Sequence, residues 1–238
     1  GDDDRWYTYW VNQRFQWFLH LGIREENLRT RIHEPDELAH YAKGATDVEY
    51  RFPWGWSELE GIANRTDFDL SRHEEHSGTK LKYFDHEINE HYWPYVIEPA
   101  LGTDRAALAL LVDAYDEEIL SNDVRVVLRF HPDIAPIQVA VLPLSRNERL
   151  VPKAQEVHRS LRKLFRTQYD DAQSIGRRYR RQDEIGTPLC VTVDFESVDT
   201  DDSVTIRNRD TMTQVRVPIR ELPISIKSEL RNMGSVKE

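Results

Sequence analysis

The chain has 238 residues, of which 39% are hydrophobic and 31% charged, a composition typical of globular proteins with one or two domains. No apolar run approaches 18 residues, and the start lacks a positively charged region followed by an apolar stretch, which argues against a transmembrane helix and a signal peptide. Cys190 is the single cysteine, so an intrachain disulfide and a cysteine zinc site are excluded. We therefore expect a reducing, cytoplasmic setting, no zinc and no membrane partner.

Charge is distributed unevenly along the chain, whose formal net charge is −10. Residues 1–133 carry 14 Lys and Arg against 27 Asp and Glu, whereas residues 134–238 carry 18 against 15. The acidic first part argues against a broad nucleic-acid surface there. The mildly basic second part permits one, because phosphate binding requires locally clustered cations rather than a positive total. Two solvated surfaces of different composition are the alternative interpretation.

The first part of the chain predicts both helices and strands. Apolar side chains recur at helical spacing from Trp10 to Leu19, and Gly22 suits the residue that follows a helix end. Apolar and charged residues alternate around Tyr50, which is typical of a strand. In chain order we expect a helix over 6–22, a helix over 36–43, strands over 46–52 and 56–63, a polar loop or insertion over 64–82, a strand over 92–98 and a helix over 103–119.

The second part begins after a proline-containing join. Pro132 and Pro136 restrict the residues before them to extended conformations, so we place a domain boundary between residues 133 and 134. Strand, helix and strand then alternate, which predicts a small α/β domain with a partly parallel sheet. We expect strands over 137–144, 189–195, 203–208 and 213–219, helices over 152–166 and 222–232, and a basic segment over 174–186.

Two acidic residues in the strand over 56–63 form a first candidate site. Glu58 and Glu60 lie two positions apart, so a regular strand would place both on one face. Such a pair can bind an ammonium group or a metal ion. The alternative, which the spacing alone favours, is the solvent-facing side of an antiparallel strand.

A second candidate site follows the strand that ends at Glu98. Pro99 and Gly102 predict a tight turn, and Arg105 then falls in the first turn of a helix. A helix N-terminus favours anions, so an arginine there gains little from the helix dipole. This local conflict is typical of a functional site, where the guanidinium could hold a phosphate or stack on a base. A surface arginine paired with Asp104 or Glu98 is the alternative.

A third candidate site is the basic segment that contains Tyr179. Its four arginines and one aromatic ring suit phosphate contacts together with stacking on an unpaired base. The four arginines are Arg177, Arg178, Arg180 and Arg181. An exposed helix with salt bridges to Asp183 and Glu184 is the alternative. We expect His73 and His76 to be solvated and assign no metal ligands, and Cys190 lies in an apolar strand pattern that indicates a core position.

Several long and unusual runs carry a family resemblance. They are HEPDELAHYAKGATDVEYRFPWGWSELEGIANRTDFDL (33–70), SGTKLKYFD (77–85), YVIEPALGTDRAALALLVDAYDEE (95–118), RVVLRFHPDIAPIQVAVLPL (125–144), IGRRYRRQDEIGTPLCVTVDFES (175–197) and RNRDTMTQVRVPI (207–219). With them the chain resembles the dimeric type of glycyl-tRNA synthetase, a class II aminoacyl-tRNA synthetase, from residue 6 onward. That family forms glycyl-adenylate from glycine, ATP and Mg²⁺ and then esterifies tRNA(Gly).

The resemblance implies a fold that combines α+β and α/β parts. Residues 1–133 resemble the later part of a class II catalytic domain, built on an antiparallel sheet, with motif 3 over about 95–118. Residues 134–238 resemble the anticodon-binding domain, a mixed sheet flanked by helices. The family is homodimeric and works in the cytoplasm, with ATP and Mg²⁺ bound together as substrate.

The resemblance also implies roles for individual residues. Arg105 matches the motif 3 arginine that holds the ATP phosphates, and Glu98 and Glu58 match acidic residues of the substrate site. The implied ATP-binding set is Glu58, Leu59, Gly102, Thr103, Asp104 and Arg105. The implied glycine-binding set is Glu58, Glu98, Pro99, Ala100, Leu101 and Gly102. The implied tRNA-binding set is Arg177, Arg178, Arg180 and Arg181.

The chain departs from the family pattern in two respects. Ala100 stands where the family usually has serine, and the class II motifs 1 and 2 are missing. Since those motifs precede the region that matches here, the expectation is the C-terminal portion of a glycine–tRNA ligase that is inactive by itself. A non-catalytic, synthetase-like RNA-binding or accessory protein is the alternative. We expect residues 1–133, produced without the rest of the chain, to aggregate through sheet edges that are left uncovered.

Overall fold

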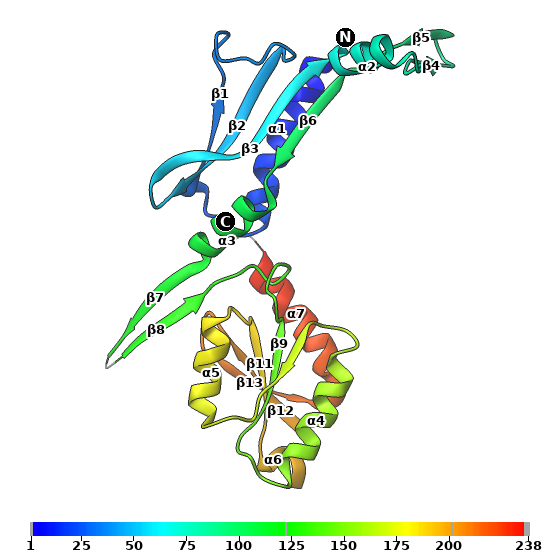
Figure 1. Cartoon of the computed structure of the whole chain (residues 1–238). Helices are drawn as coiled ribbons and strands as arrows, with labels where there is room; N and C mark the ends of the chain where they lie inside the picture. The colour runs from blue at the N-terminus through cyan, green and yellow to red at the C-terminus, as the bar shows by residue number, and fades with distance from the viewer. Residues whose placement is uncertain (1, 122, 201, 236–238) are drawn as a thin grey trace. The chain divides into compact units, whose positions relative to one another are not determined.

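A computed structural model describes residues 2–121, 123–200 and 202–235 (Figure 1). The chain divides into two compact units, residues 1–113 and 114–238. The division therefore falls earlier than the predicted boundary at residue 133. Residues 114–133 belong with the second unit because Arg125, from this stretch, forms a buried ion pair with Asp183.

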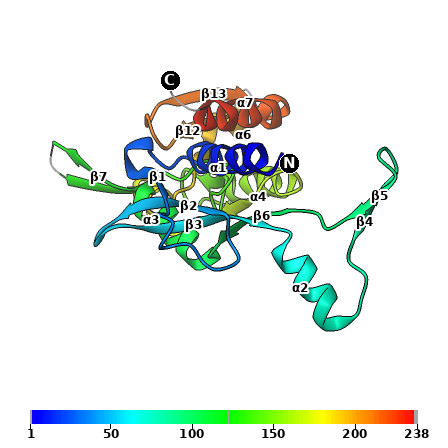
Figure 2. The ribbon, with the colours of Figure 1, turned by 90° about the horizontal axis from the view of Figure 1, so that it is seen from above.

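The first unit is built on a four-stranded antiparallel sheet with the order β1-β2-β3-β6. Phe18 of α1, Ile62 of β3 and Ala109 of α3 share one core, so both helices pack against the same sheet. The polypeptide between β3 and β6 forms α2 and a small hairpin that extend away from the sheet (Figure 2). The elements are α1 (Asp3–His20), β1 (Leu28–Ile32), β2 (Gly44–Phe52), β3 (Gly55–Thr66), α2 (Phe68–Ser77), β4 (Tyr83–Asp85), β5 (Glu90–Tyr92), β6 (Val96–Leu101) and α3 (Thr103–Ala114), with a 3-10 turn at Glu25–Asn27.

Four of the predicted elements in this unit are wrong in extent or type. The strand predicted over 92–98, with a tight turn at Pro99, instead covers Val96–Leu101, because Pro99 pairs with Ile62 inside the sheet. The segment 36–43 forms turns rather than a helix, because so short a stretch does not offset the cost of helix nucleation without a packed apolar face. The polar stretch 64–82 contains α2. The helix predicted over 103–119 ends at Ala114, where the carboxylate of the preceding Asp113 accepts hydrogen bonds from Asn27 and Tyr50 and the chain turns into a strand.

The second unit combines a hairpin with a five-stranded mixed sheet of order β10-β9-β11-β12-β13. β9 is parallel to β10 and β11, whereas β12 and β13 are antiparallel, so the predicted partly parallel sheet is confirmed. The elements are β7 (Tyr115–Leu120), β8 (Asp123–Leu128), β9 (Val139–Pro143), α4 (Leu150–Leu161), β10 (Thr167–Tyr169), α5 (Ile175–Glu184), β11 (Leu189–Val193), α6 (Phe195–Asp199), β12 (Ser203–Asn208), β13 (Gln214–Pro218) and α7 (Leu222–Gly234), with a 3-10 turn at Ile219–Glu221.

The two faces of this mixed sheet are covered by different helices. Val141 and Val191 belong to a core with α4 and α7, whereas Ala140, Leu142 and Cys190 pack against α5. β9 and β11 are buried throughout, as expected for central parallel strands covered on both faces. Cys190 is 1% exposed, which confirms its predicted core position.

Candidate functional site

The register of the first sheet decides which of the predicted residues share a face. A β-bulge in β3 places Glu58 opposite Glu49 and Glu60 opposite Val48, so one extra residue of β3 lies between the two pairs. Glu58 is exposed, whereas Glu60 is 1% exposed and accepts a hydrogen bond from Arg14 of α1 at 2.6 Å. The prediction that the two glutamates face the same side is therefore wrong, because the bulge shifts the alternation by one position.

Glu58 and Glu98 instead share the face of the sheet that α1 leaves uncovered. Beyond the bulge, Gly61 pairs with Ala100 and Ala63 pairs with Glu98, and paired residues of antiparallel strands point to the same side. The floor between the two carboxylates is thus made of Gly61, Ala63 and Ala100. A Cβ atom at Gly61 would lie 3.3 Å from Glu58 Oε1, so glycine there leaves room for the Glu58 carboxylate.

Arg105 extends from the first turn of α3 to β3, where it meets the backbone of Glu58. Its side chain donates hydrogen bonds to the backbone carbonyl of Glu58 and to the hydroxyl of Ser57, and its guanidinium lies 5.0 Å from the centre of the Phe52 ring. These partners are neutral, and within the described part of the chain this exposed guanidinium forms no ion pair. The predicted alternative, pairing with Asp104 or Glu98, is not what the structure shows, since these contacts are made with Ser57 and Glu58 instead.

Glu98 is held by a cation on the neighbouring strand. Arg65 Nη1 donates to Glu98 Oε2 at 2.7 Å, and the Glu98 side chain is 45% exposed. Arg65 also donates twice to Asp69 in the first turn of α2, from Nε at 2.5 Å and Nη2 at 2.8 Å. The hydrogen bonds to Asp69, and then to Glu98, raise the pKa of Arg65 despite its partial burial, so this guanidinium is permanently charged. Arg65 is not among the predicted site residues, although its spacing of four from Asp69 is a signal for the pair in the sequence.

The remaining residues of the implied ATP and glycine sets divide between the two faces. Ala100 lies on the open face, whereas Pro99 pairs with Ile62 and Leu101 with Glu60, so both of these point toward the α1 side. Leu59 is 2% exposed in the core. The side chains of Leu59, Pro99 and Leu101 are thus placed away from the open face, and their implied binding roles stay predictions. Gly102, Thr103 and Asp104 are exposed around the start of α3, beside Arg105.

The four arginines of the basic segment have different environments in α5. Arg178 is 1% exposed and donates to the backbone carbonyls of Pro143, Asp171, Ala172 and Gln173. This guanidinium joins the ends of β9 and β10, so its predicted contact with RNA is corrected to a structural role.

The other three arginines reach the surface to different degrees. Arg177 is exposed, Arg180 pairs with Asp123 at 2.9 Å, and Arg181 pairs with Asp170 at 2.7 Å. The predicted alternative of pairing with Asp183 or Glu184 is not seen for these side chains, because Asp183 is 1% exposed and bonds to Arg125 and Arg207 instead.

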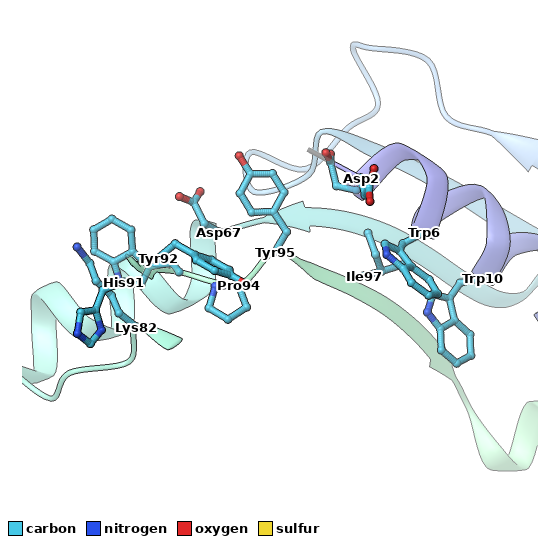
Figure 3. A pocket seen from close by; sticks show the side chains of 12 residues that line it. Asp2, Trp6, Trp10, Asp67, Lys82, His91, Tyr92, Pro94, Tyr95 and Ile97 are labelled. Carbon is cyan, nitrogen blue, oxygen red and sulfur yellow. The ribbon is translucent and has the colours of Figure 1, made fainter. Parts of the chain in front are cut away.

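A hollow of about 900 Å³ lies on the α1 side of the first sheet (Figure 3). Trp6 and Trp10 of α1 line it together with Ile97 of β6, and Tyr92 and Tyr95 line it from the segment that precedes β6. Ile97 pairs with Asn64, whose side chain bonds to Asp3 of α1, so the hollow is on the face opposite to Glu58 and Glu98. It is therefore separate from the candidate substrate site.

No group of three or more metal-ligating side chains occurs within residues 2–121, 123–200 and 202–235. His73 and His76 are exposed on α2, in agreement with the expectation of solvated side chains. Among the helices in the described part of the chain, none has the length and apolar character that crossing a membrane requires.

Comparisons with known proteins match both units. Residues 138–229 match the anticodon binding domain family. The glycine–tRNA ligase of Clostridium kluyveri is 55% identical over 232 residues, which make up 97% of this chain and 50% of that protein. The enzyme of the same name from Acetivibrio thermocellus is 56% identical over 223 residues, or 93% of this chain and 48% of that protein. The predicted resemblance to the glycine–tRNA ligases is confirmed. The chain spans about half the length of these glycine–tRNA ligases.

A solved structure shows the same fold at low sequence identity. The prolyl-tRNA synthetase of Cryptosporidium parvum, solved with L-proline and AMP, has a TM-score of 0.66 at 18% identity and covers 97% of this chain and 48% of its own. With the antiparallel first sheet and the mixed second sheet, this likeness confirms the predicted fold class, a partial class II synthetase sheet followed by an α/β domain. At this identity the likeness supports the fold and not the substrate.

Proposed function

We propose that this chain is the C-terminal portion of a glycine–tRNA ligase that activates glycine with ATP and Mg²⁺ and transfers it to tRNA(Gly). The observation that carries the proposal is the open sheet face, where Glu58 and Glu98 flank a floor of Gly61, Ala63 and Ala100. Two carboxylates suit one ammonium group, and a floor of such small side chains suits the smallest amino acid. The 55% identity to a protein named glycine–tRNA ligase supports the same substrate.

Arg105 supplies the charge that the first reaction step requires. In that step the glycine carboxylate attacks the α-phosphorus of ATP, the bond to pyrophosphate breaks, and glycyl-adenylate forms. An exposed guanidinium that is fixed by two neutral acceptors can neutralise phosphate oxygens without first breaking an ion pair. The reaction requires no enzymic nucleophile, so most of the rate comes from positioning and charge neutralisation. Mg²⁺ would accompany ATP as part of the substrate.

The second unit is proposed to bind the anticodon region of tRNA(Gly). Its match to an anticodon binding domain family supports this, and Arg177, Arg180 and Arg181 reach the surface of α5. Since Asp123 and Asp170 already pair with Arg180 and Arg181, Arg177 is the cation of this group best placed for a phosphate. Homodimer formation and a cytoplasmic location are proposed from the resemblance to the dimeric type of glycyl-tRNA synthetase.

A non-catalytic RNA-binding or accessory protein is the second candidate function. The match of residues 138–229 to the anticodon binding domain family favours RNA binding without requiring the open sheet face. The two candidates differ in whether the open sheet face is used.

Glycine-dependent exchange between ATP and pyrophosphate tests the proposal. We expect no exchange by the 238-residue chain and exchange by a longer chain that carries motif 2, with Arg105→Ala as the inactive control. Exchange by the 238 residues themselves would reject the non-catalytic alternative and show that motif 2 is dispensable. If a longer chain is also inactive, although it folds and binds tRNA, the ligase function is rejected and the accessory function remains.

A further inference from the structure

Arg65 connects the segment inserted between β3 and β6 to the candidate substrate carboxylate. Two of its nitrogens bond to both oxygens of Asp69 at the start of α2, and a third bonds to Glu98 of β6. The ring of Tyr41 lies 3.9 Å from the guanidinium carbon and covers one face of the group. Because a guanidinium is planar and rigid, the bidentate contact with Asp69 fixes the direction of the N–H group that reaches Glu98.

The backbone beside Arg65 holds an unfavourable conformation. Thr66 has a φ of 52°, in the left-handed region that β-branched residues rarely adopt, and the β3–β6 register shifts between Asn64 and Thr66. The Asn64 side chain accepts a hydrogen bond from the Thr66 N–H at 3.2 Å. Such strain persists only where surrounding contacts impose it. The contacts that impose it here are those of Arg65 and Asn64, which turn the chain from β3 into α2.

We propose that Arg65 is a positioning residue that orients the Glu98 carboxylate toward the ammonium group of the amino-acid substrate. Arg65 takes one carboxylate oxygen of Glu98, which leaves the half-exposed side chain able to present the other to a cation. The position of α2, through Asp69, is thereby coupled to the geometry of the substrate site. This inference rests on the proposed glycine activation and adds a residue that touches neither substrate directly.

The test is the kinetics of Arg65→Gln in the form of the protein that shows glycine-dependent exchange, with a thermal melt to verify folding. A positive charge near the site opposes binding of an ammonium ion, so its removal by itself would lower the KM for glycine. Loss of the positioning contact to Glu98 would instead raise the KM for glycine. We expect the KM for glycine to rise at least ten-fold while the KM for ATP changes less than two-fold.

Three further variants keep the test decisive if Arg65→Gln folds poorly. Arg65→Lys retains the charge but not the bidentate contact, so we expect an increase in the KM for glycine, smaller than that of Arg65→Gln. Asp69→Asn leaves Arg65 and Glu98 in place and weakens only the anchor, so we expect a smaller rise in the same direction. Arg72→Lys is the matched control, because Arg72 forms an exposed ion pair with Glu75 on the same helix and lies outside the proposed contact.

The outcomes distinguish the positioning role of Arg65 from the proposed function. An unchanged or lower KM for glycine in Arg65→Gln overturns the positioning role and leaves the proposed function intact. Equal losses for glycine and ATP, together with a lower melting temperature, mean that Arg65 only stabilises the fold, which also overturns it. If no form of the unsubstituted protein exchanges pyrophosphate or shows glycine binding by saturation-transfer NMR, the proposed function itself fails and the inference fails with it.

Discussion

The open face of the first sheet and the buried charges of the second unit use the same residue types in opposite ways. In the first unit, Arg105 bonds to neutral acceptors and Glu58 is exposed on the open face, so their charges stay available to a ligand. In the second unit, Arg125 is 0% exposed and its guanidinium bonds to Asp183, to Glu118 and to the carbonyl of Arg209. The comparison shows that a charged residue indicates a ligand site only where the protein itself does not neutralise it.

The largest expected effect is on the buried network. Asp183 accepts hydrogen bonds from both Arg125 and Arg207 at 2.8–3.0 Å, and all three side chains are at least nine-tenths buried. Asp183→Ala leaves two buried cations without this partner, so we expect the free energy of unfolding of the second unit to fall by about 3–5 kcal/mol. Urea denaturation monitored by circular dichroism measures this loss.

The exposed pair of Asp123 with Arg180 provides the matched control. Asp123→Ala removes an ion pair that water screens, so we expect a loss below about 1 kcal/mol. Equal costs for Asp183→Ala and Asp123→Ala would erase the distinction between buried and available charges.

The next effect concerns Cys190, which the second sheet buries completely. Burial raises the pKa of its thiol to about 12, from a usual value of 9.0. The group stays protonated at pH 8, where only a thiolate reacts rapidly with alkylating reagents. We expect iodoacetamide to label the folded chain at least about 10³-fold more slowly than the urea-unfolded chain, as read by mass spectrometry. Rapid labelling without urea would mean that the sheet opens readily and that its buried charges are not protected.

Arg105→Ala tests the other side of the comparison. Because Arg105 is exposed and its partners are neutral, we expect the melting temperature to change little. Loss of a group that stabilises charge in the transition state costs about 10²–10³-fold in rate, so exchange by the active form of the protein should fall by that amount. A stability loss as large as that of Asp183→Ala would show that Arg105, too, serves the fold.

The smallest effect is expected for Arg177 on α5. Arg177→Ala should weaken tRNA binding about two- to five-fold and reduce the slope of log affinity against log salt concentration by about 1, with stability unchanged. Filter binding at several salt concentrations measures both quantities. Arg178→Ala is the contrasting variant, because removing its four carbonyl contacts should destabilise the unit rather than alter the salt slope. A change of slope in Arg178→Ala with an unaltered fold would reverse these two assignments.

Local pattern was sufficient for most elements of the second unit. The apolar runs around Val141 and Val191 have the continuous hydrophobicity of central parallel strands, and β9 and β11 fall within the predicted ranges. The segment with Arg178 was also recognised correctly as basic, but its composition does not reveal that this one arginine is buried. Its acceptors are the carbonyls of Pro143 and of residues 171–173, which reach it only through the crossover between β9 and β10.

In the first unit the sequence predicts candidate site residues but not how they are grouped in space. Glu58, Glu98 and Arg105 were selected from the sequence, whereas Glu60 was assigned to the wrong face because alternation was assumed to be regular. The bulge that separates Glu58 from Glu60 arises from pairing with β2 and has no signature in the local pattern. Arg65 was missed for a related reason, since its partner Glu98 lies 33 residues away and meets it only across the β3–β6 pair.

The sequence by itself determined the family resemblance, the order of most elements and the residue types from which a site could be built. These depend on composition and short-range periodicity, which every stretch of the chain carries. Tertiary structure alone decided that Glu58 shares a sheet face with Glu98 rather than with Glu60. It also decided that the Arg178 guanidinium is occupied by hydrogen bonds to backbone carbonyl groups, and that Arg65 connects α2 to Glu98. The physical reason is that strand register, bulges and the pairing of buried charges are set by segments distant along the chain, and their free energies depend on contacts that no local stretch contains.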